Sequence, residues 1–239
     1  MTMIIGSVPY SNAIPLTAAL KQPIKKFTPT QLVKALRDDE IDMGLIPIYS
    51  AIKNGWHLYP EAGLIGCDGE VKSVRFFIKD DIELSRARTI YFDRESQTAT
   101  CLAKIILKEH IKNISYQEVS FPERDKADVQ LLIGDKALFF SNPGYRYEDL
   151  GELWKKKTDF GFVFACWTSK RPLAEQEIQT LKNAKQDGQK HIKNYLKKFE
   201  PKKAEILKDY FESSVVYELT PSLAQGMSNY IKLLNKFNF

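Results

Sequence analysis

Cysteine and histidine are scarce in this chain of 239 residues, which contains three of each. The cysteines, Cys67, Cys101 and Cys166, are odd in number and far apart, as is typical of reduced thiols and not of a disulfide framework. The histidines are isolated too, whereas a structural zinc site needs about four clustered ligands. The sequence therefore predicts neither disulfides nor a metal site.

Long apolar runs are also lacking. No run approaches the roughly 20 residues that a membrane-spanning helix needs. The first residues, MTMIIGSVPY, contain no basic region followed by a long apolar stretch, as a secretory signal would. We therefore expect a cytoplasmic protein that does not contact a membrane.

A strong excess of one charge is missing as well, because 35 Lys and Arg face 30 Asp and Glu, a net charge of +5. Much of the excess lies between Lys182 and Lys208, where apolar residues recur at roughly helical spacing. This pattern is most simply the solvent-exposed face of amphipathic helices, and no nucleic-acid-binding motif accompanies it. Nucleic acid is therefore not an expected partner.

What the chain does contain is an alternation of strands and helices. With 44% apolar residues it has enough material for a sizeable core. Strands are predicted at residues 4–7, 41–48, 71–79, 89–93 and 129–134. Helices are predicted from Thr28 and Pro29, which suit a cap and a first turn, and over 95–110. This order predicts an α/β fold with parallel strands.

The same order suggests two lobes. Residues 86–171 have their own series of strands and helices, flanked by the extended segments 71–79 and 160–170, which suit paired crossovers. We therefore predict a discontinuous lobe I at residues 1–85 and 172–239, a lobe II at residues 86–171, and a ligand cleft between them.

Polar residues follow predicted strands, come after the CDGE turn or begin a helix. They are Tyr10, Ser11, Asn12, Ser73, Ser96, Thr98, Gly134 and Asp135. Each on its own suits a cap or a turn. In a two-lobed fold they would all face the cleft, where the helix start at ESQTAT would offer free N–H groups to a carboxylate. This pattern indicates a small anionic ligand.

Five separated motifs carry a resemblance: SVPYSNAIPL, DMGLIP, GCDGEVKSV, LLIGDKAL and DLGELWKKKTDFGFVFACW. In this order they are similar to the chorismate dehydratase family of the futalosine route to menaquinone, over residues 3 to 170. The resemblance implies the two-lobed fold of type II periplasmic binding proteins, without an export signal. It also implies a hydro-lyase that converts chorismate to 3-[(1-carboxyvinyl)oxy]benzoate and water, with no metal or organic cofactor.

The resemblance also implies roles for single residues. Asn12 and Ser73 match the family's asparagine after the first strand and its serine after the DG turn, and are the expected catalytic residues. Substrate binding is expected from Tyr10, Ser11, Ser96, Thr98, Gly134 and Asp135.

The chain departs from the family at several positions. Gln97 and Ala99 stand where the helix start usually has arginine and serine, and Asp159, Phe160 and Gly161 replace Gly, Leu and Pro. Two alternatives stay open on this basis. One is a non-catalytic protein of the same fold that binds a small anion, and the other is the related dihydroxynaphthoate synthase, whose first motif differs. The oligomeric state is open.

Overall fold

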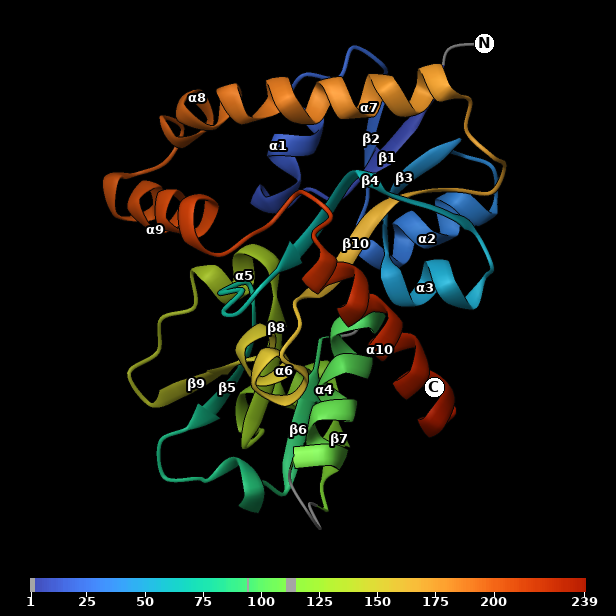
Figure 1. Ribbon diagram of the computed structural model, residues 1–239. Helices are drawn as coiled ribbons and strands as arrows, with labels where there is room; N and C mark the ends of the chain where they lie inside the picture. Colours follow the sequence, from blue (N-terminus) through green and yellow to red (C-terminus); the bar gives the residue numbers. More distant parts are fainter. Residues whose placement is uncertain (1–2, 94, 111–114) are drawn as a thin grey trace.

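Two five-stranded β-sheets, each with its own helices, make up the structure (Figure 1). The computed structural model describes residues 3–93, 95–110 and 115–239. None of the helices described there is long and apolar enough to cross a bilayer.

The first sheet has the strand order β2-β1-β3-β10-β4. Its strands are β1 (Ile5–Ser7), β2 (Ile24–Lys26), β3 (Met43–Pro47), β4 (His57–Cys67) and β10 (Phe162–Ser169). β1 pairs in parallel with β2 and β3, whereas β10 runs antiparallel to β3 and β4. The helices of this lobe are α1 (Ile14–Thr17), α2 (Pro29–Arg37), α3 (Ile48–Lys53), α7 (Glu175–Gly188), α8 (Ile192–Leu196) and α9 (Pro201–Ser213), with the 3-10 turns η1 (Ser11–Ala13) and η4 (Gln189–His191).

The second sheet has the order β7-β6-β8-β5-β9. Its strands are β5 (Val74–Lys79), β6 (Thr89–Phe92), β7 (Gln117–Val119), β8 (Val129–Ile133) and β9 (Tyr145–Asp149). The helices of this lobe are α4 (Gln97–His110), α5 (Gly134–Leu138) and α6 (Leu150–Thr158), with η2 (Leu84–Arg86) and η3 (Phe121–Lys126). The C-terminal helix α10 (Pro221–Phe237) returns from the first lobe and lies beside α4 (Figure 1).

The predicted parallel pairing is wrong for two strands, and the reason is how the chain crosses between lobes. The strands that lead toward the cleft, such as β4 and β8, end there. β5 and β10 are the first strands after each crossing, so they run away from the cleft and are antiparallel to their neighbours.

Strand pairing also differs from the predicted lobe boundaries. β5 pairs within the second sheet and β10 within the first, although the predicted boundaries at 85/86 and 171/172 assign each strand to the other lobe. The chain crosses in the turns just before these strands, at residues 68–73 and 159–161, and each strand then joins the sheet that it enters.

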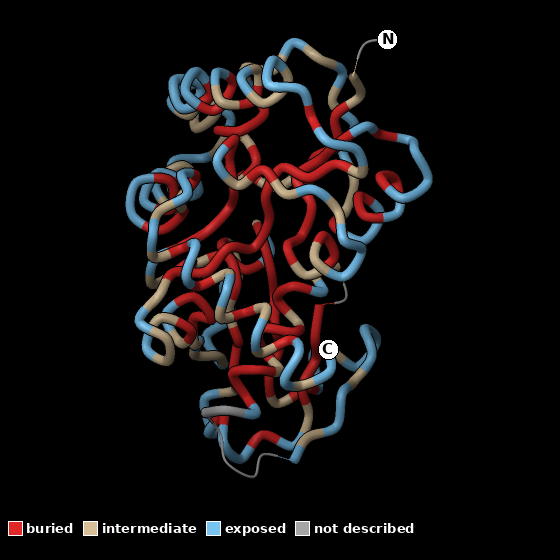
Figure 2. The backbone as a smooth tube through the Cα atoms, turned by 45° about the vertical axis from the view of Figure 1, so that its right-hand side comes forward, coloured by how far each residue is buried: buried red, intermediate tan, exposed pale blue. Residues whose placement is uncertain are grey.

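The first and second lobes each bury an apolar core (Figure 2). The expected cap of α2 is present, because the Thr28 hydroxyl accepts from the Gln31 backbone, the Gln31 side chain accepts from Thr28 N, and Pro29 occupies the first turn. The lysine-rich segment 182–208 forms α7 to α9 with mostly exposed lysines, as predicted, although Lys185 is buried in an ion pair with Glu218.

Candidate functional site

A pocket lies between the lobes, next to the carboxyl ends of β1, β3 and β8. Open α/β sheets bind ligands at this end of their strands. The pocket encloses about 540 Å³ of empty space, its open mouth included. Its wall is mostly apolar and consists of Val8, Tyr10, Asn12, Pro29, Leu45, Pro47, Ile65, Ser73, Val74, Ser96, Ile133, Gly134, Phe164 and Ala165.

Five of the eight residues predicted for the site line this pocket: Tyr10, Asn12, Ser73, Ser96 and Gly134. Tyr10 and Asn12 follow β1, which ends before Pro9, a residue with no N–H to offer a neighbouring strand. The other three come from the crossover and the second lobe. The structure therefore brings polar groups from both lobes to one cavity.

Asn12 presents an unsatisfied acceptor. Its Oδ1 is buried and has no hydrogen-bond partner in the part of the chain that the structure describes. A buried polar group left without a partner costs about 1–3 kcal/mol, so such groups in folded proteins require an explanation. Because Asn12 lines the pocket, a donor group on a bound ligand would satisfy this oxygen.

Ser73 is tied to a residue that the sequence analysis did not single out. Its Oγ lies 3.1 Å from the hydroxyl of Tyr210 on α9, and both side chains are buried. Burial raises the pKa of Tyr210, so the phenol keeps its proton at neutral pH. The amide of Asn12 interacts with the same phenol. One buried hydroxyl thus connects the two predicted catalytic residues.

Tyr10 joins the lobes across the mouth of the site. Its hydroxyl donates to Glu95 Oε2 at 2.6 Å, and burial, followed by the bond to Glu95, raises the pKa of this phenol. The Tyr10 ring lies against Gly134, where an added Cβ would stand 3.0 Å from the ring. Gly134 has a φ of 58°, so glycine is favoured there both by its backbone and by the ring.

The three other predicted residues do not line the pocket but form contacts between the lobes. Asp135 accepts from the backbone N of Ser11 at 3.0 Å and from its Oγ at 2.9 Å. Burial raises the pKa of Asp135, while the bonds from Ser11 act in the opposite direction. Thr98 Oγ1 accepts from the backbone N of Tyr49 at 3.1 Å. A direct role of these three in binding a ligand stays a prediction.

Two positive features lie near the pocket. Helix α4 starts next to Ser96, whose Oγ accepts from Ala99 N at 3.2 Å, and its N-terminus favours a negative charge. Lys26 ends β2 beside the end of β1, and its Nζ lies 3.3 Å from the carbonyl oxygen of Val8 in the pocket wall. Burial lowers the pKa of this ammonium, and within the described ranges no carboxylate pairs with it.

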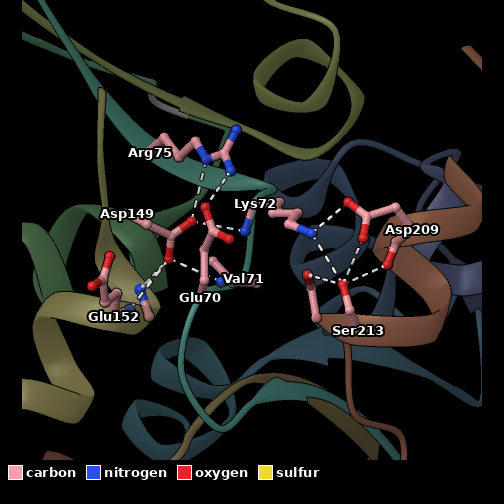
Figure 3. Close-up of polar contacts among 10 residues, drawn as sticks. Glu70, Val71, Lys72, Arg75, Asp149, Glu152, Asp209 and Ser213 are labelled. Carbon is pink, nitrogen blue, oxygen red and sulfur yellow. Dashed lines mark hydrogen bonds and ion pairs between the residues drawn. The ribbon is translucent and has the colours of Figure 1, made fainter. Parts of the chain in front are cut away.

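An ion-pair cluster fixes the crossover that carries Ser73 (Figure 3). The buried carboxylate of Asp149 accepts from Val71 N at 2.9 Å and from Lys72 N at 2.7 Å. Arg75, two residues beyond Ser73, bridges Asp149 and Glu70. This arginine is therefore engaged in holding the crossover.

The same crossover is anchored to α9. Lys72 has a φ of 61°, which turns its side chain toward the first lobe, where its ammonium donates to Asp209 and to Ser213 Oγ (Figure 3). Tyr210 lies on the same helix, between these two partners. The position of the Tyr210 hydroxyl relative to Ser73 is thus fixed at several points.

The described residues that line the pocket include no Cys, His, Asp or Glu. Among the described residues no three His, Cys, Asp or Glu side chains gather closely enough to hold a metal ion. The three cysteines are free and buried, and burial raises the pKa of each thiol, to about 11 for Cys101.

Sequence reasoning missed Tyr210, Lys26 and Glu95. Tyr210 follows Leu207 at helical spacing and precedes Phe211, a pattern that indicates only a core face. Lys26 is one lysine among many, and only strand pairing places it beside β1. The signal for Glu95 was its position next to Ser96, at the helix start already singled out.

Comparisons with known proteins identify the family and the fold of the chain. A family model described as menaquinone biosynthesis matches residues 3–236. Protein AF1704 from Archaeoglobus fulgidus has a similar structure, with a TM-score of 0.69 and 14% identity over 99% of this chain and 97% of that chain. The periplasmic aliphatic sulphonate binding protein SsuA from Escherichia coli gives 0.64 and 14%, over 99% and 92%.

A third similar structure is the Candida albicans CA3427 product, which is described as exhibiting the generic periplasmic binding protein fold. It gives a TM-score of 0.57 and 15% identity, over 99% of this chain and 90% of that chain. At such low identity these likenesses show the fold alone. The predicted two-lobed periplasmic-binding-protein fold is confirmed.

Proposed function

The chain belongs to the menaquinone biosynthesis family, and we propose that it is the chorismate dehydratase of that biosynthesis. In this proposal the enzyme acts in the cytoplasm and converts chorismate to 3-[(1-carboxyvinyl)oxy]benzoate and water. The observation that carries the proposal is the unpartnered amide oxygen of Asn12, which lines the same pocket as Ser73.

The pocket and its surroundings suit the apolar ring and the two carboxylates of chorismate. Leu45, Ile65 and Phe164 offer an apolar surface to the ring. Chorismate also has two carboxylates, and two positive features lie near the pocket. We assign one carboxylate to the N-terminus of α4, beside Ser96, and the other to Lys26, in place of the arginine that Gln97 replaces.

The reaction requires little from the protein beyond orientation and hydrogen bonds. The C3–H bond breaks and its electron pair forms the ring double bond between C3 and C4. The C4–O bond breaks at the same time, and the departing hydroxide takes up the proton removed from C3 to become water. The product is aromatic, which favours the elimination. Holding the ring with the breaking bonds aligned supplies a large part of the rate increase in such reactions.

The base for the C3 proton comes from the substrate in this mechanism. The described residues of the pocket wall include no Asp, Glu, His or Lys. Tyr10 is no base at neutral pH, because burial raises the pKa of its phenol. We therefore assign proton removal to a carboxylate of chorismate itself, held by the enzyme close to C3.

Asn12 and Ser73 act on the leaving hydroxyl. Asn12 Oδ1 accepts the hydrogen of the C4 hydroxyl and so fixes its direction, while Ser73 Oγ donates to the oxygen as it departs. Removal of one such hydrogen bond lowers kcat by about a hundredfold in comparable enzymes, which is the loss expected for Asn12→Ala and for Ser73→Ala.

The test is incubation of the purified protein with chorismate, followed by loss of the diene absorbance and identification of the product by mass. Formation of the enolpyruvyl benzoate by the wild type and its loss in both variants support the proposal. Asn183→Ala, on the exposed face of α7, is the matched control. Full turnover by Asn12→Ala or Ser73→Ala would refute the assigned roles. Calorimetric binding of chorismate without turnover would indicate the alternative, an anion-binding protein like SsuA.

A further inference from the structure

Tyr210 stands out as a buried hydroxyl that packing alone does not need. Its ring lies in the first-lobe core with Leu207 and Phe211, where phenylalanine would fill the same space. Its hydroxyl nevertheless reaches the crossover and lies 3.1 Å from Ser73 Oγ. Tyr217, also buried in the same core, has a hydroxyl with no partner among the described residues. The two tyrosines therefore differ in what their hydroxyl groups contact.

The hydroxyl groups of Tyr210 and Ser73 can each donate to the other. The side chains of Ser73 and Asn12 both act to lower the pKa of the Tyr210 phenol, against the larger effect of burial. The phenol has one hydrogen of its own, and Ser73 Oγ lies at the right distance to accept it. When the phenol donates to Ser73, the Ser73 hydrogen and the Asn12 Oδ1 are both left for a ligand in the pocket.

We propose that Tyr210 is a positioning residue for the dehydration: its hydroxyl orients the Asn12 amide to accept from the substrate and the Ser73 hydroxyl to donate to it. This inference rests on the proposed function for its kinetic test. Its geometric part concerns only the arrangement of three side chains that lie on the crossover, on η1 and on α9.

Contacts on both sides of Tyr210 support this role. Asp209 and Ser213 of α9 bind the Lys72 ammonium, next to Ser73 in the sequence. The helix and the crossover therefore cannot slide past each other without breaking these bonds (Figure 3). An element held this firmly keeps the hydroxyl within the tight limits that a reacting geometry needs.

The kinetic test compares Tyr210→Phe with Tyr217→Phe. Each variant loses one buried hydroxyl from the same core, so the pair controls for the change in packing. We expect Tyr210→Phe to lower kcat about tenfold to a hundredfold while KM for chorismate stays within about threefold. Tyr217→Phe should keep the wild-type kcat. Thermal unfolding of both variants, compared with that of the wild type, separates loss of orientation from loss of fold.

A double-mutant cycle with Ser73→Ala adds a readout that a merely structural role would not change. If Tyr210 acts through Ser73, Tyr210→Phe lowers kcat much less in the Ser73→Ala background than in the wild type. Independent effects of the two substitutions, or a wild-type kcat for Tyr210→Phe, would overturn the inference.

A spectroscopic measurement keeps this inference separate from the proposed function. If the wild type does not turn over chorismate, the proposed function fails, and the inference is judged on the side-chain amide signals of Asn12 in a ¹H–¹⁵N spectrum. These signals should shift in Tyr210→Phe and stay in place in Tyr217→Phe. Equal spectra for the two variants would refute the contact between Tyr210 and Asn12.

Discussion

Lys26 is the residue that tests how the pocket recognises a charged ligand. Strand pairing places it opposite Ser7, at the edge of the sheet that faces the pocket, while Lys25 pairs with Gly6 and donates to the carbonyl of Glu40 instead. Successive side chains of a strand point to opposite faces, so the two lysines form a matched pair of equal charge.

Lys26→Ala should raise KM for chorismate about tenfold, because it removes the attraction between the ammonium and a substrate carboxylate, and leave kcat nearly unchanged. The difference should shrink as salt is added, because salt screens the attraction. Lys25→Ala should behave as the wild type. Steady-state kinetics at two ionic strengths check this, and equal KM values for the two variants would exclude Lys26 from the site.

The predictability of the site can be judged from three residues. Asn12 and Ser73 were predicted because they lie in motifs that resemble those of a known family. Both residues line the pocket. Tyr210 was not predicted, because a tyrosine on an amphipathic helix has the same sequence pattern with or without a hydrogen bond to its hydroxyl. Its partner Ser73 lies 137 positions earlier, and no local rule connects them.

The turn between β8 and α5 is the element whose shape the site depends on most directly. Gly134 has a φ of 58°, and its N donates to the carbonyl of Ser73 at 2.7 Å. A Cβ there would meet the Tyr10 ring at 3.0 Å. Gly55, in the turn after α3, has a similar φ of 65° but nothing within 4 Å of an added Cβ.

Gly134→Ala and Gly55→Ala should each lower the free energy of unfolding by about 1–2 kcal/mol, the cost of a left-handed conformation for alanine. Only Gly134→Ala should also impair turnover of chorismate, because only its methyl group displaces Tyr10. Urea unfolding and kinetics on both variants check this. Unchanged kinetics for Gly134→Ala would mean that the position of the Tyr10 ring does not matter.

The strands and helices were easier to predict than their pairing. The segments 71–79 and 160–170 have the composition of strands, and the structure contains β5 and β10 within them. Which sheet each one joins depends on where the chain crosses, and the crossing is fixed by distant contacts such as those of Asp149 with Val71 and Lys72. The amino-acid composition of a segment does not predict such distant contacts.

The two lobes meet through polar groups that the sequence suggested as ligand contacts. Tyr10 binds Glu95, Ser11 binds Asp135, and Thr98 binds the backbone of Tyr49, each pair joining one lobe to the other. These residues lie between the lobes because strand ends and helix starts gather there. Whether such a side chain faces the ligand or the opposite lobe depends on how closely the lobes approach, and this is a property of the folded chain.

Asp135 makes this contact between lobes sensitive to pH. Burial raises the pKa of its carboxyl above the value of about 3.9 for an unfolded chain. Between the two pKa values the folded state holds a proton that the unfolded state has lost, so the free energy of unfolding falls as the pH rises through this window. Above the folded pKa the whole penalty of burying the charge is present.

Asp135→Asn should therefore match the wild-type stability below about pH 4 and exceed it at neutral pH, because asparagine keeps the shape without the buried charge. The amide oxygen can still accept from Ser11 N, and the Ser11 hydroxyl can accept from the amide nitrogen. Thermal unfolding of both proteins from acidic to neutral pH measures the difference, with Asp81→Asn on the exposed turn after β5 as the control for one lost negative charge. If Asp135→Asn were instead less stable than the wild type at neutral pH, the bonds from Ser11 to the ionised carboxylate would outweigh the cost of burying it.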